Sequence, residues 1–598
     1  MTLVDVRPPA PVPAPPRARR RARPDRVALG LLLAGTTALY TVALPRSGWG
    51  NAFYAGAAQA GAASWRAWFY GASDAPGSIT VDKPPAALWV MGLSVRLFGL
   101  SSWSLLVPEA LMGVAAVAVL AATVRRLLGP WPGVLAGLLL ALTPVVTLVF
   151  RYDNPDALLT LLLVLAGWAT SRALEDGRTR WLLLAGVVVG FGFLTKSLQA
   201  FLVLPGLAGA YLVAGPPRLR RRLGQLVLAG VALVAAAGWW LLVVALVPRA
   251  DRPWVGGTAD DSPLGLAFGY NGLGRLDGDE SAGGAGLHHG PSTLGRLFGS
   301  AGDQAGWLLP TALLALVAGL WLVRRAPRTD RVRAALLLWG GWLLVSAVVL
   351  GLMKGIEHSY YAVVLGPAVA ALVAVTGTLL WRRRDRTARV LLALGVLTAV
   401  AWAATLVVLR IGGSLGLVLA IAATGGPAVV GLLGRRRTWV AGLAVLAVSL
   451  GPLAWSVGTA ARAHTGSNVV AEPPPRTAAG WSAPRRDGAG ISERALRLIE
   501  QGAEGWTWAA ATTGHHGASI QLAAGVPVMD VGGFAGQDPS PTFDQFVADV
   551  TAHRVHWWVA GVSGGPDALR IQTWVAAHGT RVPAGETDLY DLSALATG

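Results

Sequence analysis

Lysine is rare in this chain, and each of its lysines lies in a polar motif that could do chemistry. Of the 50 Lys and Arg residues, only Lys83, Lys196 and Lys354 are lysines. An ammonium group is a compact point charge suited to phosphate at sites where the planar fork of arginine does not fit. The three positions therefore indicate a phosphate-bearing ligand.

The first motif is VDKPP, residues 81–85. Paired prolines rigidify the backbone and push the residue before them toward an extended conformation. Asp82 and Lys83 are thereby held next to each other as an acid and a base. A simple ion pair that anchors the chain at a water–membrane boundary is the alternative, and it explains one lysine more readily than three.

The second motif is RYDNPD, residues 151–156, which directly precedes an apolar run. Asp153 or Asn154 can cap the helix that follows, which leaves Asp156 free at the membrane boundary. An ionisable residue at that depth is costly and is by default a functional hypothesis. We expect Asp156, and after it Asp153, to act as catalytic carboxylates, with Arg151 as a further cation.

Two more motifs combine lysine with other polar groups. FLTKSLQA places Lys196 between two apolar runs that predict a tight helical hairpin. A snorkelling side chain is the alternative, but arginine would snorkel as well. MKGIEHSYY is rich in polar and aromatic groups, namely Lys354, Glu357, His358, Tyr360 and Tyr361. This motif suits a phosphate, a sugar hydroxyl or a divalent metal, although tyrosines at an interface are usually belt residues.

The aromatic segment WRAWFY adds stacking surface for a sugar or a lipid, through Trp65 and Trp68. Taken together, the motifs supply carboxylates for proton transfer and ammonium groups for phosphate. Electrostatic stabilisation of a departing phosphate would then be a main catalytic effect. If a divalent metal takes part, Asp82 and His358 are its candidate ligands.

The elements that position these motifs are membrane-spanning helices. Hydrophobic residues make up 54% of the chain and charged residues 14%, against about 25% charged residues in soluble proteins. The net charge of +18 does not indicate nucleic-acid binding, because the arginines fall in short clusters between apolar runs, as in cytoplasmic loops. The absence of cysteine excludes disulfides, thiolate metal sites and cysteine nucleophiles.

Apolar runs long enough to cross a hydrocarbon core of about 30 Å recur along the chain. We predict thirteen spans, at 27–45, 102–123, 129–149, 157–173, 181–195, 198–214, 225–247, 305–323, 333–352, 361–380, 389–409, 415–433 and 437–457. The segment 84–99 is interrupted by Arg96 and is expected to lie along the interface. With the N-terminus inside, all six arginine-rich loops fall on the cytoplasmic side.

This arrangement divides the chain into three parts. Residues 1–26 are Pro-rich and Arg-rich, which predicts a disordered cytoplasmic tail. Residues 27–457 form the transmembrane domain, with large outer loops at 46–101 and 248–304. Residues 458–598 form a linker and an extracytoplasmic domain. All three lysines then lie on the non-cytoplasmic face.

The C-terminal part alternates strand and helix after a Pro-rich linker, residues 471–477. This alternation predicts a small α/β domain with a parallel sheet. The expected strands are 506–511, 526–531 and 555–561, and the expected helices lie near 491–502, 515–524, 541–553 and 566–578. The connection GGFAGQDPSP, residues 532–541, lies where such sheets often bind ligands, although a loop of Gly and Pro is ordinarily only a loop.

These motifs in this order resemble the membrane glycosyltransferases of the GT-C fold, in the family of the protein O-mannosyltransferases and the aminoarabinose transferase (glycosyltransferase family 39). Within that family, the motifs look like those of the YkcB-like mannosyltransferase branch. The resemblance rests on GWGNAFYAGAAQAGAASWRAWFYGASDAPGSITVDKPP, GYNGLGRL, KGIEHSYY and GGFAGQDPSPT. It covers essentially the whole chain from residue 27.

The resemblance implies a polyprenyl-phosphate sugar as donor, used on the outer face of the cytoplasmic membrane with inversion at the sugar. Asp82 and Lys83 match the acidic–Lys–Pro–Pro motif, Asp156 the aspartate of the second outer loop, and Lys196 a lysine on the phosphate side. One departure stands out, because many relatives carry an acid early in the first loop, where this chain has Asn51. The catalytic base must then be one of the two aspartates, unless the acceptor needs no strong base.

The sequence thus predicts a glycosyltransferase that moves a sugar, with mannose as one candidate, to an unknown acceptor in the cell envelope: a protein, a glycan or a lipid. The expected phosphate ligands are Lys83, Lys196, Lys354 and Arg151. The expected substrate-binding residues are Tyr270, Asn271, His358, Tyr360, Tyr361, Trp65 and Trp68. A transporter or flippase for a lipid-linked anion is the alternative, but the hydrophobic segments show no inverted repeat. A glycan-binding receptor would leave the membrane carboxylates unexplained.

Overall fold

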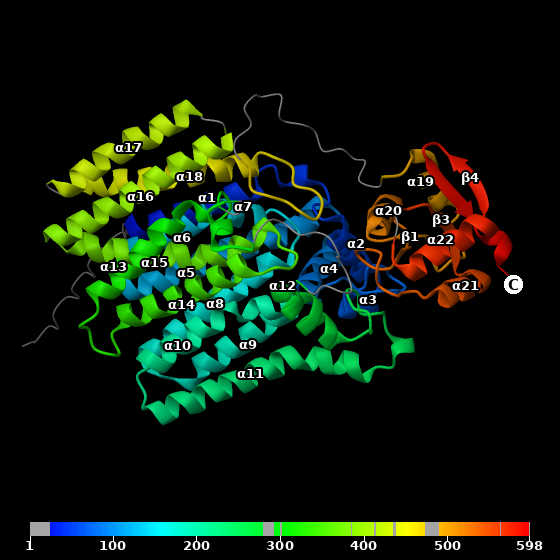
Figure 1. Cartoon of the computed structure of the whole chain (residues 1–598), viewed down its shortest axis with the longest axis horizontal. Helices are drawn as coiled ribbons and strands as arrows, with labels where there is room; N and C mark the ends of the chain where they lie inside the picture. The colour runs from blue at the N-terminus through cyan, green and yellow to red at the C-terminus, as the bar shows by residue number, and fades with distance from the viewer. Residues whose placement is uncertain are drawn as a thin grey trace, which may run out of the picture.

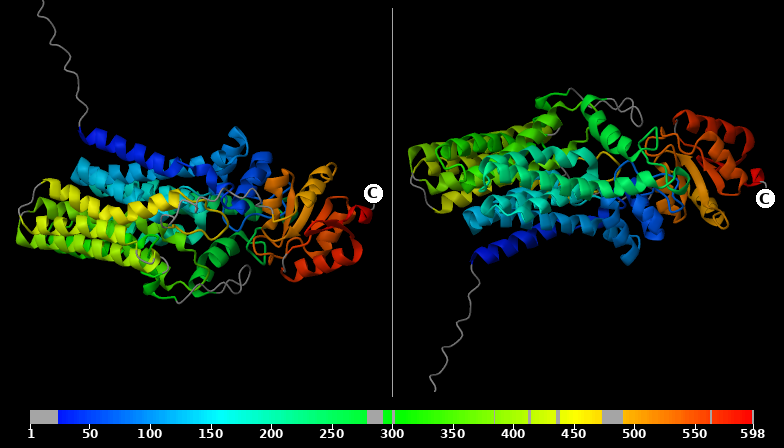
Figure 2. Two further views of the ribbon diagram at one scale, coloured as in Figure 1. Left: turned by 90° about the horizontal axis from the view of Figure 1, so that it is seen from above. Right: turned by 90° about the horizontal axis from the view of Figure 1, so that it is seen from below.

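A bundle of long helices forms most of the molecule, and a small α/β domain lies at one end of it (Figures 1 and 2). The computed structural model describes residues 24–278, 292–299, 302–383, 385–411, 414–434, 438–472, 490–561 and 564–596. The predicted tail, residues 1–26, falls almost wholly outside the described residues, and so do residues 473–477 of the predicted linker.

Ten helical runs in the described part of the chain are long and apolar enough to cross a membrane. The helices of the bundle are α1 (Pro24–Thr41), α5 (Ser102–Leu128), α6 (Pro130–Ala141), α7 (Pro144–Val149), α8 (Pro155–Asp176), α9 (Thr179–Lys196), α10 (Leu204–Ala214), α11 (Leu219–Leu246), α13 (Leu309–Leu322), α14 (Arg331–Leu352), α15 (Gly366–Arg382), α16 (Arg386–Ile411), α17 (Leu415–Leu433) and α18 (Thr438–Ala460). The prediction of a helical multi-pass membrane protein is confirmed.

Three features account for the difference between thirteen predicted spans and ten long runs. The predicted span 129–149 is broken between α6 and α7, because Thr143 precedes a proline and takes an extended conformation. The predicted span 305–323 contains only the shorter helix α13 after a 3₁₀ turn. The predicted spans 181–195 and 198–214 belong to one continuous helical run, Thr179–Ala214.

That continuous run is a hairpin, as the sequence predicts. Ser197 has a φ of 46°, a left-handed conformation that is strained for serine and reverses the chain direction. Gly177, just before α9, lies against Pro217, just after α10, with only 2.9 Å from an added Cβ to the proline Cγ. The start of α9 and the end of α10 therefore lie at the same end of the bundle, and Lys196 lies near the turn of the hairpin.

Small residues allow the hairpin to approach its neighbours closely. A Cβ on Gly190 in α9 would lie 2.7 Å from the carbonyl oxygen of Leu233 in α11. A Cβ on Gly206 in α10 would lie 2.8 Å from the carbonyl oxygen of Leu338 in α14. Helix packing through small residues is typical of membrane bundles, where close backbone contact replaces the hydrophobic effect.

The arginine-rich loops gather at one end of the bundle, which we call the arginine end. Arg126 pairs with Glu175 at 2.9 Å, and Arg328 donates to the carbonyl of Gly215 at 2.8 Å. Arg382 donates to the carbonyl of Leu128, at the end of α5, and Arg389 to that of Leu433 at 3.1 Å, at the end of α17. Five of the six predicted clusters thus share one end. Residues 435–437 of the sixth lie outside the described residues.

The opposite end, which carries Lys83 and Lys196, is called the lysine end. The first outer loop folds there into three short helices, α2 (Ala52–Ala63), α3 (Trp65–Tyr70) and α4 (Ala86–Phe98). Helix α4 covers the segment that the sequence predicts to lie along the interface, and it has 13 residues. Its Arg96 guanidinium lies 3.8 Å from the ring centroid of Trp65, an arrangement typical of the water–membrane boundary.

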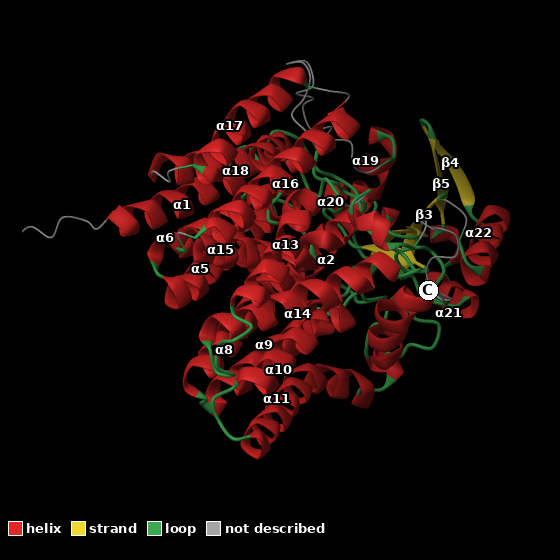
Figure 3. Ribbon diagram, turned by 60° about the vertical axis from the view of Figure 1, so that its left-hand side comes forward, coloured by secondary structure: helices red, strands yellow, loops and turns green. Residues whose placement is uncertain are grey.

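The α/β domain contains all the strands of the sheet (Figure 3). Its helices are α19 (Glu493–Gln501), α20 (His516–Ala524), α21 (Phe543–Thr551) and α22 (Pro566–His578), and its strands are β1 (Trp508–Thr513), β2 (Val528–Val531), β3 (Val555–Val559), β4 (Thr580–Ala584) and β5 (Thr587–Asp591). The strand order is β2-β1-β3-β5-β4. Strands β1, β2 and β3 are parallel as predicted, and the antiparallel hairpin of β4 and β5 was not predicted.

The α/β domain packs directly on the first outer loop. Helix α20 lies against α2, where a Cβ on Gly56 would lie 3.0 Å from the Cβ of Ala518. Gln521 donates to the carbonyls of Gly56 at 3.0 Å and Ser73 at 3.1 Å. The Trp508 indole donates to the buried carboxyl of Asp74 at 3.0 Å. These contacts fix the domain above the lysine end of the bundle.

Candidate active site

The VDKPP segment forms the first half of the site, just before α4. The ammonium nitrogen of Lys83 lies 2.9 Å from a carboxylate oxygen of Asp82 and 3.1 Å from the Asp82 carbonyl. Asn271 donates to the same carbonyl at 2.7 Å, and the Tyr270 ring centroid lies 5.2 Å from the ammonium. The paired prolines end with Pro85 as the residue that precedes α4. The structure therefore places Asp82 and Lys83 as a fixed, buried pair.

The second half of the site joins α8 to the tip of the hairpin. Asn154 caps α8 by accepting from the amide of Asp156 at 2.7 Å, so the cap is Asn154 and not Asp153. This cap leaves the Asp156 carboxylate free to pair with the ammonium of Lys196. Both side chains are buried. The Tyr361 ring centroid lies 3.8 Å from the Lys196 ammonium.

The two halves face one another across one site. The Lys83 ammonium interacts electrostatically with Asp156 and with Arg275 as well as with Asp82. Burial lowers the pKa of Lys83, more than the aspartates raise it. Burial raises the pKa of Asp82, but Lys83 and Arg275 outweigh that effect, so the pKa lies below its usual value. Asp82 is therefore ionised at neutral pH.

Arg275 is a member of the site that the sequence analysis did not single out. It lies in α12 (Gly274–Asp277), where its guanidinium carbon is 4.5 Å from the ring centroid of Tyr270. It donates to the carbonyl of Ile356 at 3.3 Å. The motif GYNGLGRL contains Arg275, but arginine is the common basic residue of this chain, so this arginine carried no signal.

Tyrosines and one histidine line the site. Tyr54 of α2 is buried and interacts with Asp82, Tyr270, Tyr360 and Tyr361. The His358 ring stacks on Tyr360, with centroids 5.1 Å apart, and its Nδ1 lies 3.2 Å from the Asn468 side-chain oxygen. Burial and the nearby Lys196 lower the pKa of His358 to about 3, so the imidazole is neutral.

The predicted metal ligands do not form a metal site. In the described part of the chain, no group of three or more His, Cys, Asp or Glu side chains lies close enough together to hold a metal ion. Asp82 is paired with Lys83, and His358 with Asn468. These residues do not fit a bound divalent metal, and we derive no catalytic step through one.

Two residues of RYDNPD support the fold and lie apart from the ligand-facing groups. Arg151 is buried and donates to the carbonyls of Leu39, Val42 and Ala460 at 2.7 to 2.9 Å. Its terminal nitrogens are thereby used by the backbone, which does not favour the predicted phosphate role. Asp153 accepts from the amide of Asn51 at 2.7 Å. Burial raises its pKa well above the usual value, and its catalytic role stays a prediction.

Three other predicted residues lie outside the site. Lys354 is exposed, and its backbone amide bonds to the carbonyl of Leu276. Trp65 is 57% exposed and stacks with Arg96. The Trp68 indole donates to the carbonyl of Trp89 at 2.9 Å. The tryptophans form an interfacial aromatic cluster, so the structure does not bring them to the substrate position predicted for them.

Unsatisfied carboxylate oxygens mark the centre of the site. Asp82 Oδ1 and Asp156 Oδ1 are buried and have no hydrogen-bond partner. Ser197 Oγ, beside Lys196, is also buried and has no hydrogen-bond partner. Buried polar atoms without partners are rare in native proteins and each needs an explanation. Two carboxylate oxygens and a hydroxyl without partners, beside the buried lysines Lys83 and Lys196, suit a polar, phosphate-bearing ligand.

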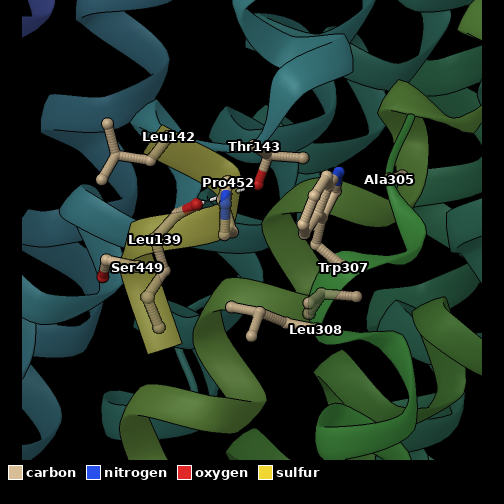
Figure 4. A pocket seen from close by; sticks show the side chains of 9 residues that line it. Leu139, Leu142, Thr143, Ala305, Trp307, Leu308, Ser449 and Pro452 are labelled. Carbon is tan, nitrogen blue, oxygen red and sulfur yellow. Dashed lines mark hydrogen bonds between the residues drawn. The ribbon is translucent and has the colours of Figure 1, made fainter. Parts of the chain in front are cut away.

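The bundle has cavities elsewhere that are not the active site. The cavity in Figure 4 is lined by Leu139, Thr143, Trp307 and Pro452 among others and holds about 10 Å³, at most the space for one water. A chamber of about 1070 Å³ lies at the arginine end, and its lining is mostly apolar. Neither cavity contains a carboxylate–lysine pair.

Two family models match the chain. A model described as dolichyl-phosphate-mannose-protein mannosyltransferase matches residues 82–241, and one described as "Putative mannosyltransferase YkcB-like, C-terminal" matches residues 495–578. The "Putative mannosyltransferase YkcB" of Bacillus subtilis (strain 168) is 28% identical over 642 residues, which cover 89% of this chain and 88% of that protein. The "Putative mannosyltransferase YycA" of the same organism is 26% identical, and the match covers 94% of each chain.

Solved structures share the fold. ArnT from Cupriavidus metallidurans, bound to undecaprenyl phosphate, aligns with a TM-score of 0.58 and 17% identity over 95% of this chain and 99% of that chain. The oligosaccharyltransferase AglB from Archaeoglobus fulgidus, in complex with an inhibitory peptide and a dolichol-phosphate, aligns with a TM-score of 0.52 and 11% identity over 90% of this chain and 69% of that chain. The prediction is therefore confirmed that this chain is a membrane glycosyltransferase with the GT-C fold and a YkcB-like C-terminal domain.

Proposed function

We propose that this protein transfers a sugar from a polyprenyl-phosphate carrier to a hydroxyl group of a cell-envelope acceptor. One observation carries the proposal: two buried lysine–carboxylate pairs face each other, and each leaves a carboxylate oxygen without a partner. The ArnT and AglB structures contain polyprenyl-type phosphates, which supports a lipid-linked donor here. The names of the Bacillus relatives make mannose the first sugar to test.

The position of each pair suggests its role. Lys196 and Asp156 lie at the ends of spanning helices, at the depth where a phosphate on a lipid tail would enter. Lys83 and Arg275 lie above them in the outer loops. We assign the donor phosphate to Lys196, Lys83 and Arg275. Asp156 is then a positioning residue that holds Lys196.

Asp82 is the proposed base. It is ionised and lies in the first outer loop, on which the α/β domain packs and where a water-soluble acceptor would arrive. Asp82 takes the proton of the acceptor hydroxyl while the acceptor oxygen forms a bond to the anomeric carbon of the sugar. The bond between that carbon and the phosphate oxygen breaks, and its electron pair leaves with the polyprenyl phosphate. The three cations stabilise the charge that develops on the leaving phosphate.

The charge distribution supports an outer location for the reaction. Cytoplasmic loops of membrane proteins carry an excess of arginine and lysine, and the arginine clusters gather at the end opposite the site. We therefore propose that the arginine end faces the cytoplasm and that the lysine end and the α/β domain lie outside the cytoplasmic membrane.

The purified protein in lipid vesicles tests this function. Radiolabelled polyprenyl-phosphate mannose and glucose are supplied with a cell-envelope extract as acceptor, and release of polyprenyl phosphate is followed for the wild type and Asp82→Asn. We expect release that depends on the extract and is lost in the variant. Movement of the intact lipid between leaflets without release would instead support the flippase.

A further inference from the structure

The loop after β2, residues 532–541, reaches from the α/β domain to the first outer loop. The Phe534 ring meets Phe53 of α2 edge-on, with centroids 5.2 Å apart. His515 stacks on Phe534 with centroids 4.6 Å apart. A Cβ on Gly533 would lie 3.1 Å from the Cδ1 of Ile79, two residues before the VDKPP segment. The loop is thus packed directly beside the segment that carries Asp82.

The carboxyl group of Asp538 connects this loop to the second outer loop. It accepts a hydrogen bond from the amide of Gly257 at 2.7 Å, between residues 281 positions apart in sequence. The segment around Gly257 is also bonded to Thr80, the residue before VDKPP: Thr80 donates its amide to the Trp254 carbonyl at 2.8 Å, and Gly256 donates to the Thr80 hydroxyl at 3.0 Å. One strip of backbone, residues 254–257, therefore lies between Asp538 and Asp82.

Gly257 has no room for a side chain at this place. Its φ of 77° is left-handed, and a Cβ there would lie 3.3 Å from the Cβ of Asp82 and 3.2 Å from the Cδ1 of Tyr270. Burial, and to a smaller extent the charge of Asp82, raise the pKa of Asp538 to about 8. The contact therefore places a mainly uncharged acceptor close to the proposed base, where a second negative charge would oppose it.

We propose that the α/β domain is part of the catalytic centre and that Asp538 is a positioning residue, which holds residues 254–257 against Asp82 and Tyr270. The catalytic consequence rests on the proposed function, whereas the contact itself does not. A domain built in this way completes the site only when it is docked.

Hydrogen exchange in the full-length protein tests the contact without any substrate. Asp538→Ala should lower the protection of the amides at 254–257 by about tenfold or more, because a buried hydrogen bond is lost. Asp538→Asn keeps an acceptor oxygen and should restore protection, and Asp544→Ala, at an exposed acid in the same domain, should change nothing. Unchanged protection in Asp538→Ala would overturn the proposal.

Turnover separates positioning from mere support of the fold. Asp538→Ala should lower kcat by about ten- to a hundredfold through misplacement of the base, with KM for the donor nearly unchanged and with rescue by Asp538→Asn. Equal kcat in Asp538→Ala and wild type would overturn the positioning role. If the wild type consumes no donor, the proposed function fails, and the exchange result alone decides the contact.

A second inference concerns the chamber of about 1070 Å³ at the arginine end. It lies among helices α6, α13, α15, α16 and α18, and its depth is lined by aliphatic side chains such as Leu138 and Val445. Three tryptophans from the terminal turns of α6, α13 and α15 line its mouth: Trp131, Trp321 and Trp381. Trp131 is 59% exposed, so the chamber opens to its surroundings.

The mouth carries positive charge. Arg382 lines it, and Arg386 and Arg389 follow in the first turn of α16. The acid in this stretch, Asp385, is used to cap α16 by accepting from the amide of Ala388 at 2.8 Å. An apolar depth below a ring of tryptophan and arginine matches an amphiphile with hydrocarbon chains and an anionic head group.

We propose that the chamber binds one anionic phospholipid, with its phosphate beside Arg382 and its acyl chains among the five helices. Three glycines line the chamber from three helices, Gly377, Gly395 and Gly442, and a Cβ on any of them would have no atom within 4 Å. The space can therefore be filled by substitution without displacing a neighbour. Gly230 on α11 is a matched control, because its Cβ would also meet nothing within 4 Å.

Native mass spectrometry tests this site. Protein from vesicles of phosphatidylglycerol and phosphatidylcholine should retain one phosphatidylglycerol in the wild type and in Gly230→Leu. The variant Gly395→Leu with Gly442→Leu should lose it at least tenfold more readily, and Arg382→Gln should lose the preference for the anionic lipid. Equal retention in all variants, or retention of polyprenyl phosphate in place of phospholipid, would overturn the proposal.

Discussion

The two ends of the bundle use their basic residues differently. At the lysine end, Lys83 and Lys196 pair with the carboxylates of Asp82 and Asp156, and each carboxylate keeps one buried oxygen without a partner. At the arginine end, several guanidinium groups donate to carbonyls at helix ends, as Arg389 does to Leu433, and others pair with exposed or half-buried carboxylates, as Arg126 does with Glu175. The first arrangement leaves buried oxygens for a ligand inside the protein, whereas the second stabilises helix termini at the surface of the bundle.

Arg151 shows that the bonding pattern is a better guide than location. It lies in the motif beside Asp156, yet it donates to three backbone carbonyls as the arginines of the other end do. A planar fork with five donors satisfies several carbonyls at once, which makes it a structural clamp. The compact ammonium satisfies one carboxylate and can turn to a phosphate.

Lys196→Met should produce the largest effect. Loss of a cation that stabilises the leaving phosphate lowers kcat by about 10²–10³-fold. Because an unpaired buried Asp156 would also cost about 3–5 kcal/mol of stability, the double variant with Asp156→Asn serves as a neutral control. Single-turnover measurement of polyprenyl phosphate release checks the rate. A double variant that folds and turns over normally would contradict the assignment.

Arg275→Gln should have a smaller effect. Arg275 adds charge to the same site but already donates to the Ile356 carbonyl and lies against Tyr270. We expect a fall of about tenfold or more in kcat/KM, from the loss of one charge-assisted hydrogen bond to phosphate. Steady-state kinetics over a range of donor concentrations would show it. An unchanged value would remove Arg275 from the site.

The docking of the α/β domain should weaken as pH rises. The pKa of Asp538 is 3.8 as a free side chain and about 8 when the domain is docked. At a pH between these two values, Asp538 carries a proton in the docked state and has lost it in the released state. Docking therefore becomes less favourable as pH rises from about 4 to about 8, and its free energy no longer changes with pH above that range. Asp74 and Asp530, whose pKa values burial also raises, act in the same direction.

Spin labels can follow this docking, because the chain has no cysteine of its own. Ala63→Cys on α2 and Ala576→Cys on α22 are exposed positions for a distance measurement. The distribution of distances between the two labels should broaden with rising pH more in the wild type than in Asp538→Asn. The difference between the two proteins gives the contribution of Asp538. Identical pH profiles would contradict the raised pKa.

Arg389→Gln should have the smallest effect. The hydrogen bond from Arg389 to the end of α17 is exposed to solvent. Removing it should lower the free energy of unfolding by about 0.3–1 kcal/mol, and donor consumption should not change. A thermal melt together with a turnover assay checks both. A large loss of turnover in this variant would remove the contrast between the two ends.

Hydropathy and arginine clustering were sufficient to predict the helical bundle, the hairpin with Lys196 and the shared end of the arginine loops. The hairpin of β4 and β5 was missed because Pro583 lies in β4, and proline argues against a paired strand. The break before Pro144 was missed because both sides of it are apolar.

The candidate site was predicted in part, because each carboxylate and each lysine lies in a readable motif, whereas the contacts between motifs are distant in sequence. The residues of VDKPP and RYDNPD were readable, and so was the lysine of the hairpin. Asp538 and Gly257 are 281 residues apart, and only the docking of a second domain brings them together. Arg151 is bound by backbone carbonyls that are distant in sequence, and Lys354 is exposed because of the path of its loop. No motif specifies either of these features.

The most direct test of the central claim is the binding of polyprenyl phosphate to the protein in nanodiscs. We expect saturable binding by the wild type, at least tenfold weaker binding by Lys196→Met, and unchanged binding by Lys354→Met, whose lysine is exposed. Equal binding by all three proteins would contradict the claim that the buried lysine–carboxylate pairs form the phosphate site.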